Sequence, residues 1–271
     1  MTQSSAKAEL GAFCPGPIAL VVAHPDDECL WLSSVLSAAS RIVFAFGDPF
    51  GRPKIAAGRQ RAVAELPLPG LINLAIPESG SRLAVDLSRP RLTPTGIAIG
   101  DEQAARRYDD NFDRLVTGLR PILAGYGVVF THNPWGEYGH PEHIQLHRAI
   151  LSLQAELGYT VGFSNYVDRR SWPLAQEIGR LPVWTQRFTL TTDRDLARRL
   201  MAVYRRHGVW TWTNWHRWPA RETVYLRPAT AAPEDWRSLS GEQLLDVAGL
   251  RWWPPPWRRA AQRLAGVPTF R

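Results

Sequence analysis

An apolar run that ends in a cluster of charged side chains is the feature that most constrains the fold of this chain. Residues Ile18 to Val22 are all apolar, and they lead into His-Pro-Asp-Asp-Glu at residues 24–28. Such a run is typical of a buried strand, and a helix is expected after the turn. Ligands of open α/β sheets bind at the carboxyl ends of strands. Adjacent aspartates beside a histidine are costly there unless a cation balances them, so the pattern predicts a metal site.

Apolar strands and helical stretches alternate along much of the chain. The pattern predicts strands over 41–46, 71–76, 127–131 and 223–226, and helices over 29–39, 56–66, 101–126, 141–157 and 193–207. This alternation is typical of parallel βαβ units. We therefore expect an α/β fold: a Rossmann-like open, mostly parallel sheet flanked by helices, with a smaller irregular Trp-rich C-terminal part. The proline-rich interval 81–100 is expected to be a loop, and Pro121 is expected to bend or end its helix.

Length and composition favour one large domain with an appended tail. The chain has 271 residues, of which 45% are hydrophobic, which is ample for a sizeable core. We expect a catalytic domain over 12–228 and a basic, Trp- and Pro-rich extension over 229–271. This extension is expected to pack on the domain, and the alternative is a peripheral membrane or partner anchor.

The net charge of +7 is compatible with anionic or lipid-linked substrates or a membrane surface, or with an arginine-rich coding bias. No nucleic-acid module accompanies the charge, so nucleic acid is not an expected partner. The 2 cysteines imply no disulfide framework. Because no signal peptide or long apolar run is recognisable, we expect a cytoplasmic protein. The sequence does not define the oligomeric state.

A second cluster, Gly-His-Pro-Glu-His at residues 139–143, follows another predicted strand. A parallel sheet places both clusters at the same edge. His24, one aspartate and His143 would supply nitrogen and oxygen ligands and leave a position open, which is the pattern of a catalytic zinc site. His147 lies one helical turn beyond His143. We interpret it as a supporting or helix-surface residue, whereas His132 either orients a carboxylate or is structural.

The two clusters together resemble the paired signature of the LmbE-like, or PIG-L-like, N-acetylglucosaminyl deacetylases. Ala-His-Pro-Asp-Asp-Glu at residues 23–28 matches the family motif in full, whereas Glu142 stands where the family usually has aspartate. The similarity in element order covers roughly residues 18–157. The resemblance implies a zinc-dependent hydrolase that removes an acetyl group from an N-acetylated amino sugar. The substrate would be a glycolipid, a glycan or a glycosylated metabolite.

The resemblance also implies roles for individual residues. His24, Asp27 and His143 would hold Zn²⁺, and Fe²⁺ or Co²⁺ would also suit this ligand set. Asp26 would be the general base that deprotonates the attacking water. His140 would support the tetrahedral oxyanion and protonate the departing amine, because an amine is a poor leaving group.

Supporting and substrate-binding roles follow in part from the resemblance and in part, for Glu78 and Trp212, from residue type and position. Glu28 and Glu142 would support the site, but the extra methylene of Glu142 makes its hold on His140 less secure. The candidate substrate-binding residues are Tyr138, Glu78, Arg61 with Arg59 nearby, and Trp212. The Trp-rich stretch 210–218 would either cover the sugar as a lid or pack a C-terminal subdomain.

Two other functions fit parts of the pattern. Two histidines and a carboxylate also form the metal triad of non-haem iron enzymes, although those typically have all-β barrels. A non-catalytic carbohydrate-binding protein on the same scaffold is the second alternative. Binding alone would need neither the base Asp26 nor the acid His140, so a deacetylase is the favoured interpretation.

Overall fold

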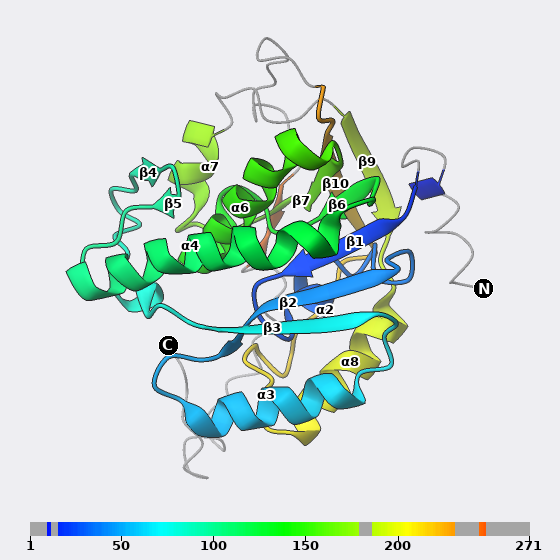
Figure 1. Ribbon diagram of the computed structural model, residues 1–271. Helices are drawn as coiled ribbons and strands as arrows, with labels where there is room; N and C mark the ends of the chain where they lie inside the picture. The colour runs from blue at the N-terminus through cyan, green and yellow to red at the C-terminus, as the bar shows by residue number, and fades with distance from the viewer. Residues whose placement is uncertain (1–9, 12–15, 179–185, 231–243, 248–271) are drawn as a thin grey trace.

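A seven-stranded sheet forms the centre of the described part of the chain, which comprises residues 10–11, 16–178, 186–230 and 244–247 of this computed structural model (Figure 1). Its strands in spatial order are β3 (Leu71–Pro77), β2 (Arg41–Asp48), β1 (Ile18–Val22), β6 (Val128–Phe130), β7 (Thr160–Ser164), β10 (Arg221–Arg227) and β9 (Gln186–Thr191). The strands from β3 to β7 are parallel, and β10 is antiparallel to both its neighbours. The predicted α/β fold with a mostly parallel sheet is confirmed.

Strand β1 is buried on both faces, as its unbroken apolar sequence predicts. Side chains alternate along a strand. Leu20 and Val22 accordingly belong to one hydrophobic core, and Ala19 and Val21 belong to the other. The two cores lie on opposite faces of the sheet, so β1 is the element around which both layers pack.

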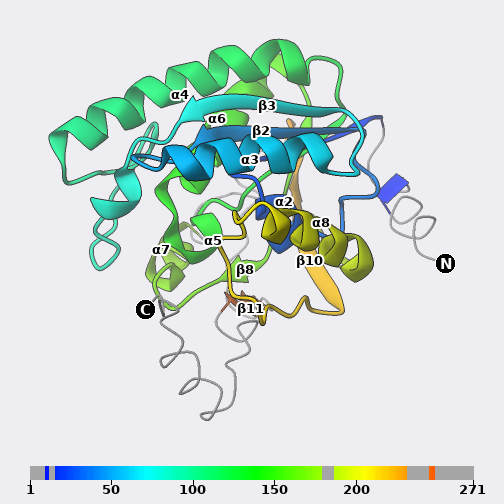
Figure 2. The same cartoon turned by 90° about the horizontal axis from the view of Figure 1, so that it is seen from below.

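Helices cover both faces of the sheet (Figures 1 and 2). The core that contains Leu20 packs against α2 (Asp27–Trp31), α3 (Pro53–Glu65) and α8 (Arg194–Arg206), and the core that contains Val21 packs against α4 (Glu102–Leu123) and α6 (Pro141–Leu157). Helix α4 continues past Pro121 for two residues, and α6 has the predicted bounds. Among the described helices, none has the length and apolar character of a membrane-spanning segment.

Short elements surround the carboxyl edge of the sheet. They are the 3₁₀ turn η1 (Ser81–Leu83), the hairpin β4 (Leu92–Thr93) and β5 (Gly96–Ile97), α5 (Gly136–Gly139), β8 (Tyr166–Val167) and α7 (Trp172–Ile178). The expected loop 81–100 is therefore partly ordered into a turn and a hairpin. Strands β7, β8 and β9 and helix α7 had no sequence prediction.

The helix expected over residues 29–39 is wrong beyond Trp31, where α2 ends. In a continued helix the carbonyl of Cys29 would accept the amide of Ser33. The indole of Trp218 donates to that carbonyl instead. The buried carboxylate of Glu222 accepts the Ser33 hydroxyl at 2.8 Å and the Ser34 amide at 2.9 Å. Contacts from distant parts of the chain thus replace the local helical bonds.

The predicted boundary at residue 228 does not end the folded unit. Strand β11 (Leu245–Asp246) pairs in parallel with β8, and Val247 is buried in the core that contains Leu20. The remainder of the expected extension, 231–243 and 248–271, lies outside the described residues, and with it the predicted anchor.

Candidate metal centre

Both sequence clusters lie at the carboxyl edge of two adjacent parallel strands. Strand β1 leads into residues 23–28 and β6 leads into residues 132–143, and the two strands are paired. Strand order reverses here, because β2 and β3 extend to one side of β1 whereas β6 and β7 extend to the other. Ligands of open α/β sheets bind at such switch points.

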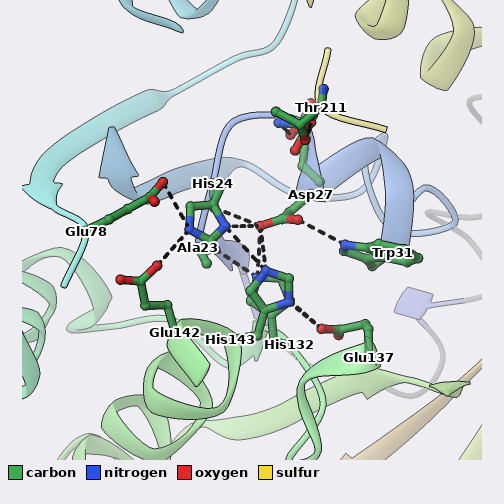
Figure 3. Close-up of polar contacts among 12 residues, drawn as sticks. Ala23, His24, Asp27, Trp31, Glu78, His132, Glu137, Glu142, His143 and Thr211 are labelled. Atoms are coloured by element: carbon green, nitrogen blue, oxygen red, sulfur yellow. Dashed lines mark hydrogen bonds and ion pairs between the residues drawn. The ribbon is translucent and has the colours of Figure 1, made fainter. Parts of the chain in front are cut away.

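Three candidate ligand atoms converge on one point (Figure 3). Nδ1 of His24 lies 3.1 Å from Oδ2 of Asp27, and Nε2 of His143 lies 3.3 Å from each of these atoms. Ligands at about 2.0–2.2 Å from a tetrahedral metal lie about 3.3–3.6 Å from one another. All three side chains are buried. The trio therefore fits a divalent ion such as Zn²⁺, and its nitrogen and oxygen donors suit Fe²⁺ or Co²⁺ as well.

Two further histidines lie within reach of the same cluster. Nε2 of His132 accepts the backbone amide of Ala23 at 2.8 Å, so that lone pair is not available to a metal. The ring of His140 stacks on that of His143 with the centroids 4.6 Å apart. His147 is buried, and its Nδ1 contacts the carbonyl of His132 at 2.7 Å, which is a supporting position in the core.

The carboxylate of Asp26 is held by the segment that follows α8. Its Oδ2 accepts the hydroxyl of Thr211 and, at 3.2 Å, the Thr211 amide. Asp26 has a φ of 112°, a left-handed conformation that is uncommon for a non-glycine residue. Burial first, and then the charge of Asp27, raises the pKa of Asp26 to about 7, although Arg59 and Thr211 act in the opposite direction. A carboxylate with such a pKa suits general base catalysis near neutral pH.

Glu28 supports the same turn from inside the core. Its Oε2 accepts the amide of Asp26 at 3.0 Å, and its Oε1 accepts the hydroxyl of Tyr204 at 2.8 Å. Burial raises the pKa of Glu28 to about 8. The side chain therefore connects the turn after β1 to helix α8.

His140 is buried beside the converging trio. Its Nδ1 has no hydrogen-bond partner among the described residues. Burial, followed by the neighbouring His143 and His24, holds the pKa of His140 well below its usual range.

Glu142 does not contact His140, which corrects the expectation that it holds that ring. Its Oε2 lies 3.1 Å from Nε2 of His24, and its Oε1 accepts the amide and hydroxyl of Ser79 at 2.7 and 2.9 Å. The longer side chain thus reaches a candidate metal ligand and the loop after β3.

Of the two candidate arginines, Arg59 contacts the candidate site, whereas a substrate-binding role of Arg61 stays a prediction. The Arg61 side chain is exposed and that of Arg59 is buried. Two residues along a helix turn a side chain through about 200°, so both cannot face the sheet. Nη1 of Arg59 donates to Oε1 of Glu78 at 2.8 Å, and that oxygen lies 3.6 Å from Nε2 of His24.

An aromatic group lies beside the histidines. The ring of Tyr138 lies 5.7 Å from that of His140 and 5.4 Å from that of Trp212, measured between centroids. Trp212 also packs edge-on against Trp31 at 5.1 Å. In the same stretch, Trp218 is buried. Trp218 therefore packs in the core, whereas Trp212 lies beside the candidate site, and a role as a lid over the sugar stays a prediction.

The sequence missed two residues of this site. Glu137 is buried, and its Oε2 contacts Nδ1 of both His143 and His132 (Figure 3). An acidic residue between two glycines, next to a histidine motif, was the available signal. Thr211 had no local signal, because only the tertiary fold brings it to Asp26.

Fold and site together define an α/β protein with a buried histidine–carboxylate centre of the kind that binds a catalytic metal. No family model matches the chain. Over 163 residues it is 26% identical to 1D-myo-inositol 2-acetamido-2-deoxy-alpha-D-glucopyranoside deacetylase of Corynebacterium kroppenstedtii, covering 52% of this chain and 41% of that protein. The chain thus spans about two fifths of the length of this curated relative. The match confirms the resemblance to the LmbE-like deacetylases.

Solved structures of deacetylases also align with the chain. A teicoplanin-biosynthesis deacetylase in complex with teicoplanin aligns with a TM-score of 0.48 and 14% identity, covering 77% of this chain and 97% of that one. The N,N'-diacetylchitobiose deacetylase of Pyrococcus horikoshii aligns with a TM-score of 0.45 and 13% identity, covering 79% and 85%.

Proposed function

We propose that the chain is a metal-dependent hydrolase that removes the N-acetyl group from an N-acetylglucosamine-type amino sugar in a glycoconjugate or glycosylated metabolite. The observation that carries this proposal is the convergence of Nδ1 of His24, Oδ2 of Asp27 and Nε2 of His143 within 3.1–3.3 Å of one another. The curated relative acts on an acetamido-glucopyranoside, which supports the choice of sugar.

In this proposal His24, Asp27 and His143 hold the metal, with zinc as the first choice. When bound, such an ion polarises an amide carbonyl and lowers the pKa of water. His24 and His143 bind as neutral imidazoles, and Asp27 binds as a carboxylate. Oδ1 of Asp27 accepts the indole N–H of Trp31 at 2.9 Å, whereas Oδ2, which also accepts the His24 amide at 2.8 Å, faces the other two ligands.

Asp26 and His140 carry out the proton transfers. Asp26 accepts a proton from the attacking water as the new carbon–oxygen bond forms. The ring N–H of His140 donates a hydrogen bond to the oxyanion. When the carbon–nitrogen bond breaks, His140 passes one proton to the departing amine and takes up in its place the proton that Asp26 accepted from the water. Acetate and the free amino sugar then leave, and both side chains are back in their starting protonation states.

The sugar is proposed to lie against the aromatic group and the rim carboxylate. Tyr138 and Trp212 offer ring faces of the kind that stack on sugars. Glu78 is partly exposed and can accept sugar hydroxyls while Arg59 fixes its position. A substrate-binding role of the exposed Arg61 stays a prediction.

Acetate release from N-acetylglucosamine conjugates with added Zn²⁺ tests the proposal. The variant Asp26→Asn should lower kcat by about 10²–10⁴-fold, because it removes the general base and keeps the size of the side chain. Glu222→Gln is the matched control, since Glu222 is a buried carboxylate outside the candidate centre. Equal turnover by wild type and Asp26→Asn would refute the assigned base.

The same preparation distinguishes the two alternatives. Sugar binding without turnover over a broad panel of N-acyl sugars would indicate a carbohydrate-binding protein. Oxygen consumption with Fe²⁺ and an oxo-acid would indicate a non-haem iron enzyme, because His24, Asp27 and His143 would also form the triad of that class.

A further inference from the structure

We propose that Glu137 is a positioning residue of the metal centre, whose carboxylate fixes the rings of His132 and His143 so that Nε2 of His143 faces His24 and Asp27. The inference rests on the proposed function in one respect, that His143 is a metal ligand. It goes further because it assigns a role to a residue outside the two sequence motifs.

The contact to His143 selects the nitrogen that binds the metal. Oε2 of Glu137 lies 2.7 Å from Nδ1 of His143. An ionised carboxylate only accepts hydrogen bonds, so Nδ1 must carry the proton. The lone pair is then on Nε2, the atom that lies 3.3 Å from both other candidate ligands. Metal-binding histidines generally donate their second ring N–H in this way, and the partner holds both tautomer and ring orientation.

His132 connects the Glu137 carboxylate to Ala23, the first residue of the motif at residues 23–28. Its Nε2 accepts the backbone amide of Ala23 at 2.8 Å, so its proton is on Nδ1. That Nδ1 lies 3.0 Å from Oε2 of Glu137. The rings of His132 and His143 stack with centroids 3.7 Å apart. A continuous chain of hydrogen bonds therefore connects the backbone beside one ligand, His24, with the ring of another, His143.

The rest of Glu137 is anchored as firmly as its Oε2. Its Oε1 accepts the amide of Asn133 at 3.1 Å, its own amide donates to Oδ1 of Asn133 at 2.8 Å, and its carbonyl accepts the hydroxyl of Ser171 at 2.6 Å. The side chain is fully buried, with 0% exposed. These contacts hold the carboxylate against the two rings.

The backbone of Glu137 is strained, which supports a role for its side chain. Its φ of 51° and ψ of −73° lie near the γ-turn conformation with positive φ, which is rare for a non-glycine residue. Such strain is found preferentially at functional sites. A glycine would relieve it, so the glutamate is explained by what its carboxylate does.

Zn²⁺ affinity, measured by competition with a chromophoric chelator, tests the inference without any turnover. Glu137→Gln should bind Zn²⁺ about 10–100-fold more weakly than wild type, the usual cost of losing such a partner. Glu137→Gly should bind as weakly although it relieves the backbone strain, which guards against a folding defect in the first variant. Glu222→Gln should keep the wild-type affinity, since its carboxylate binds Ser33, Ser34 and Tyr166.

Each outcome is decisive. Weaker binding in both Glu137 variants, with Glu222→Gln unchanged, supports the inference whether or not any sugar is deacetylated. Wild-type affinity in Glu137→Gln or Glu137→Gly overturns it and leaves the proposed function standing. A wild-type protein that binds no Zn²⁺ overturns both, whereas one that binds Zn²⁺ and releases no acetate refutes only the proposed function.

Discussion

Three buried carboxyl groups of the candidate centre differ in acidity because their neighbours differ. Burial alone would raise the pKa of each. For Asp27, His143 and His132 reverse the effect and bring the pKa well below its usual range. For Glu137 the same two rings lower the pKa to about 2. Asp26 has no histidine partner and a pKa of about 7, so it is the one of the three suited to exchange protons near neutrality.

His147 should make the fold sensitive to acid. Burial lowers its pKa from 6.5 to about 3, so the folded protein keeps the ring neutral while the unfolded chain takes up a proton below pH 6.5. Stability is therefore lost as pH falls from 6.5 towards 3, by about 2 kcal/mol at pH 5. His147→Asn keeps a donor for the His132 carbonyl and cannot be protonated.

Urea unfolding of both proteins at pH 7.5 and pH 5 measures this effect. The loss of stability between the two pH values should be about 2 kcal/mol smaller in His147→Asn, whatever the absolute stability of the variant. An equal loss in both proteins would show that His147 is not the acid-sensitive group.

The segment between α8 and β10 contributes to the site from a distant part of the chain. Thr211 donates two hydrogen bonds to Asp26, and Trp212 lies beside Tyr138. Figure 2 shows this segment passing close to α2, which begins at the turn that carries Asp26. The orientation of the proposed base is thus set by an element outside both motifs.

Removing the Thr211 hydroxyl should therefore slow the proposed reaction. Thr211→Val keeps the shape and the amide donor but loses one hydrogen bond to a charged group, worth about 1.5–3 kcal/mol, or about 10–100-fold in kcat. Thr211→Ser retains the hydroxyl and should remain near wild type. Steady-state acetate release gives kcat and KM for each variant. A change in KM with kcat unchanged would contradict a role of Thr211 in holding the base.

Periodic apolar patterns in the sequence correctly predicted those strands and helices whose structure depends on their own side chains. The buried strand at Ile18–Val22 and the helix at Pro141–Leu157 were predicted with their observed bounds. The prediction of a helix over 29–39 was wrong because side chains of Glu222 and Trp218 form hydrogen bonds with backbone groups that a longer helix would have paired internally. Such long-range contacts cannot be recognised from the sequence around residues 29–39.

The same distinction between local pattern and tertiary contact applies to the candidate site. His24, Asp27 and His143 stand in recognisable motifs, and the structure brings them together. The pairing of Glu142 with His24 depended on one methylene and on the position of Ser79. The choice of Arg59 over Arg61 depended on the phase of α3. Neither could be read from a single sequence.

At the scale of the whole molecule, a metal should stabilise the fold. The three candidate ligands come from the turn after β1, from the start of α2 and from α6, the helix before β7, so an ion would join the two halves of the sheet. An ion that binds only the folded state adds about 2.7 kcal/mol when its free concentration is one hundred times Kd.

Thermal unfolding with and without a chelator measures this stabilisation. The midpoint should fall on chelation and recover with Zn²⁺. Mg²⁺ is the matched control, because it prefers oxygen ligands and an octahedral site. The same recovery with Mg²⁺, or none with Zn²⁺, would argue against the assigned ligand set.

The pairing of β11 with β8 has a consequence for the order of events during synthesis. The carbonyl of Tyr166 in β8 accepts hydrogen bonds from the side chains of Asn133 and Trp135, which lie just before Glu137 in the chain. The neighbour of β8 is Leu245–Asp246. A ribosome therefore has to translate past both metal motifs, and on to this late strand, before the segment that positions His143 can gain its full support. The centre is therefore expected to mature only after residue 246 has been translated.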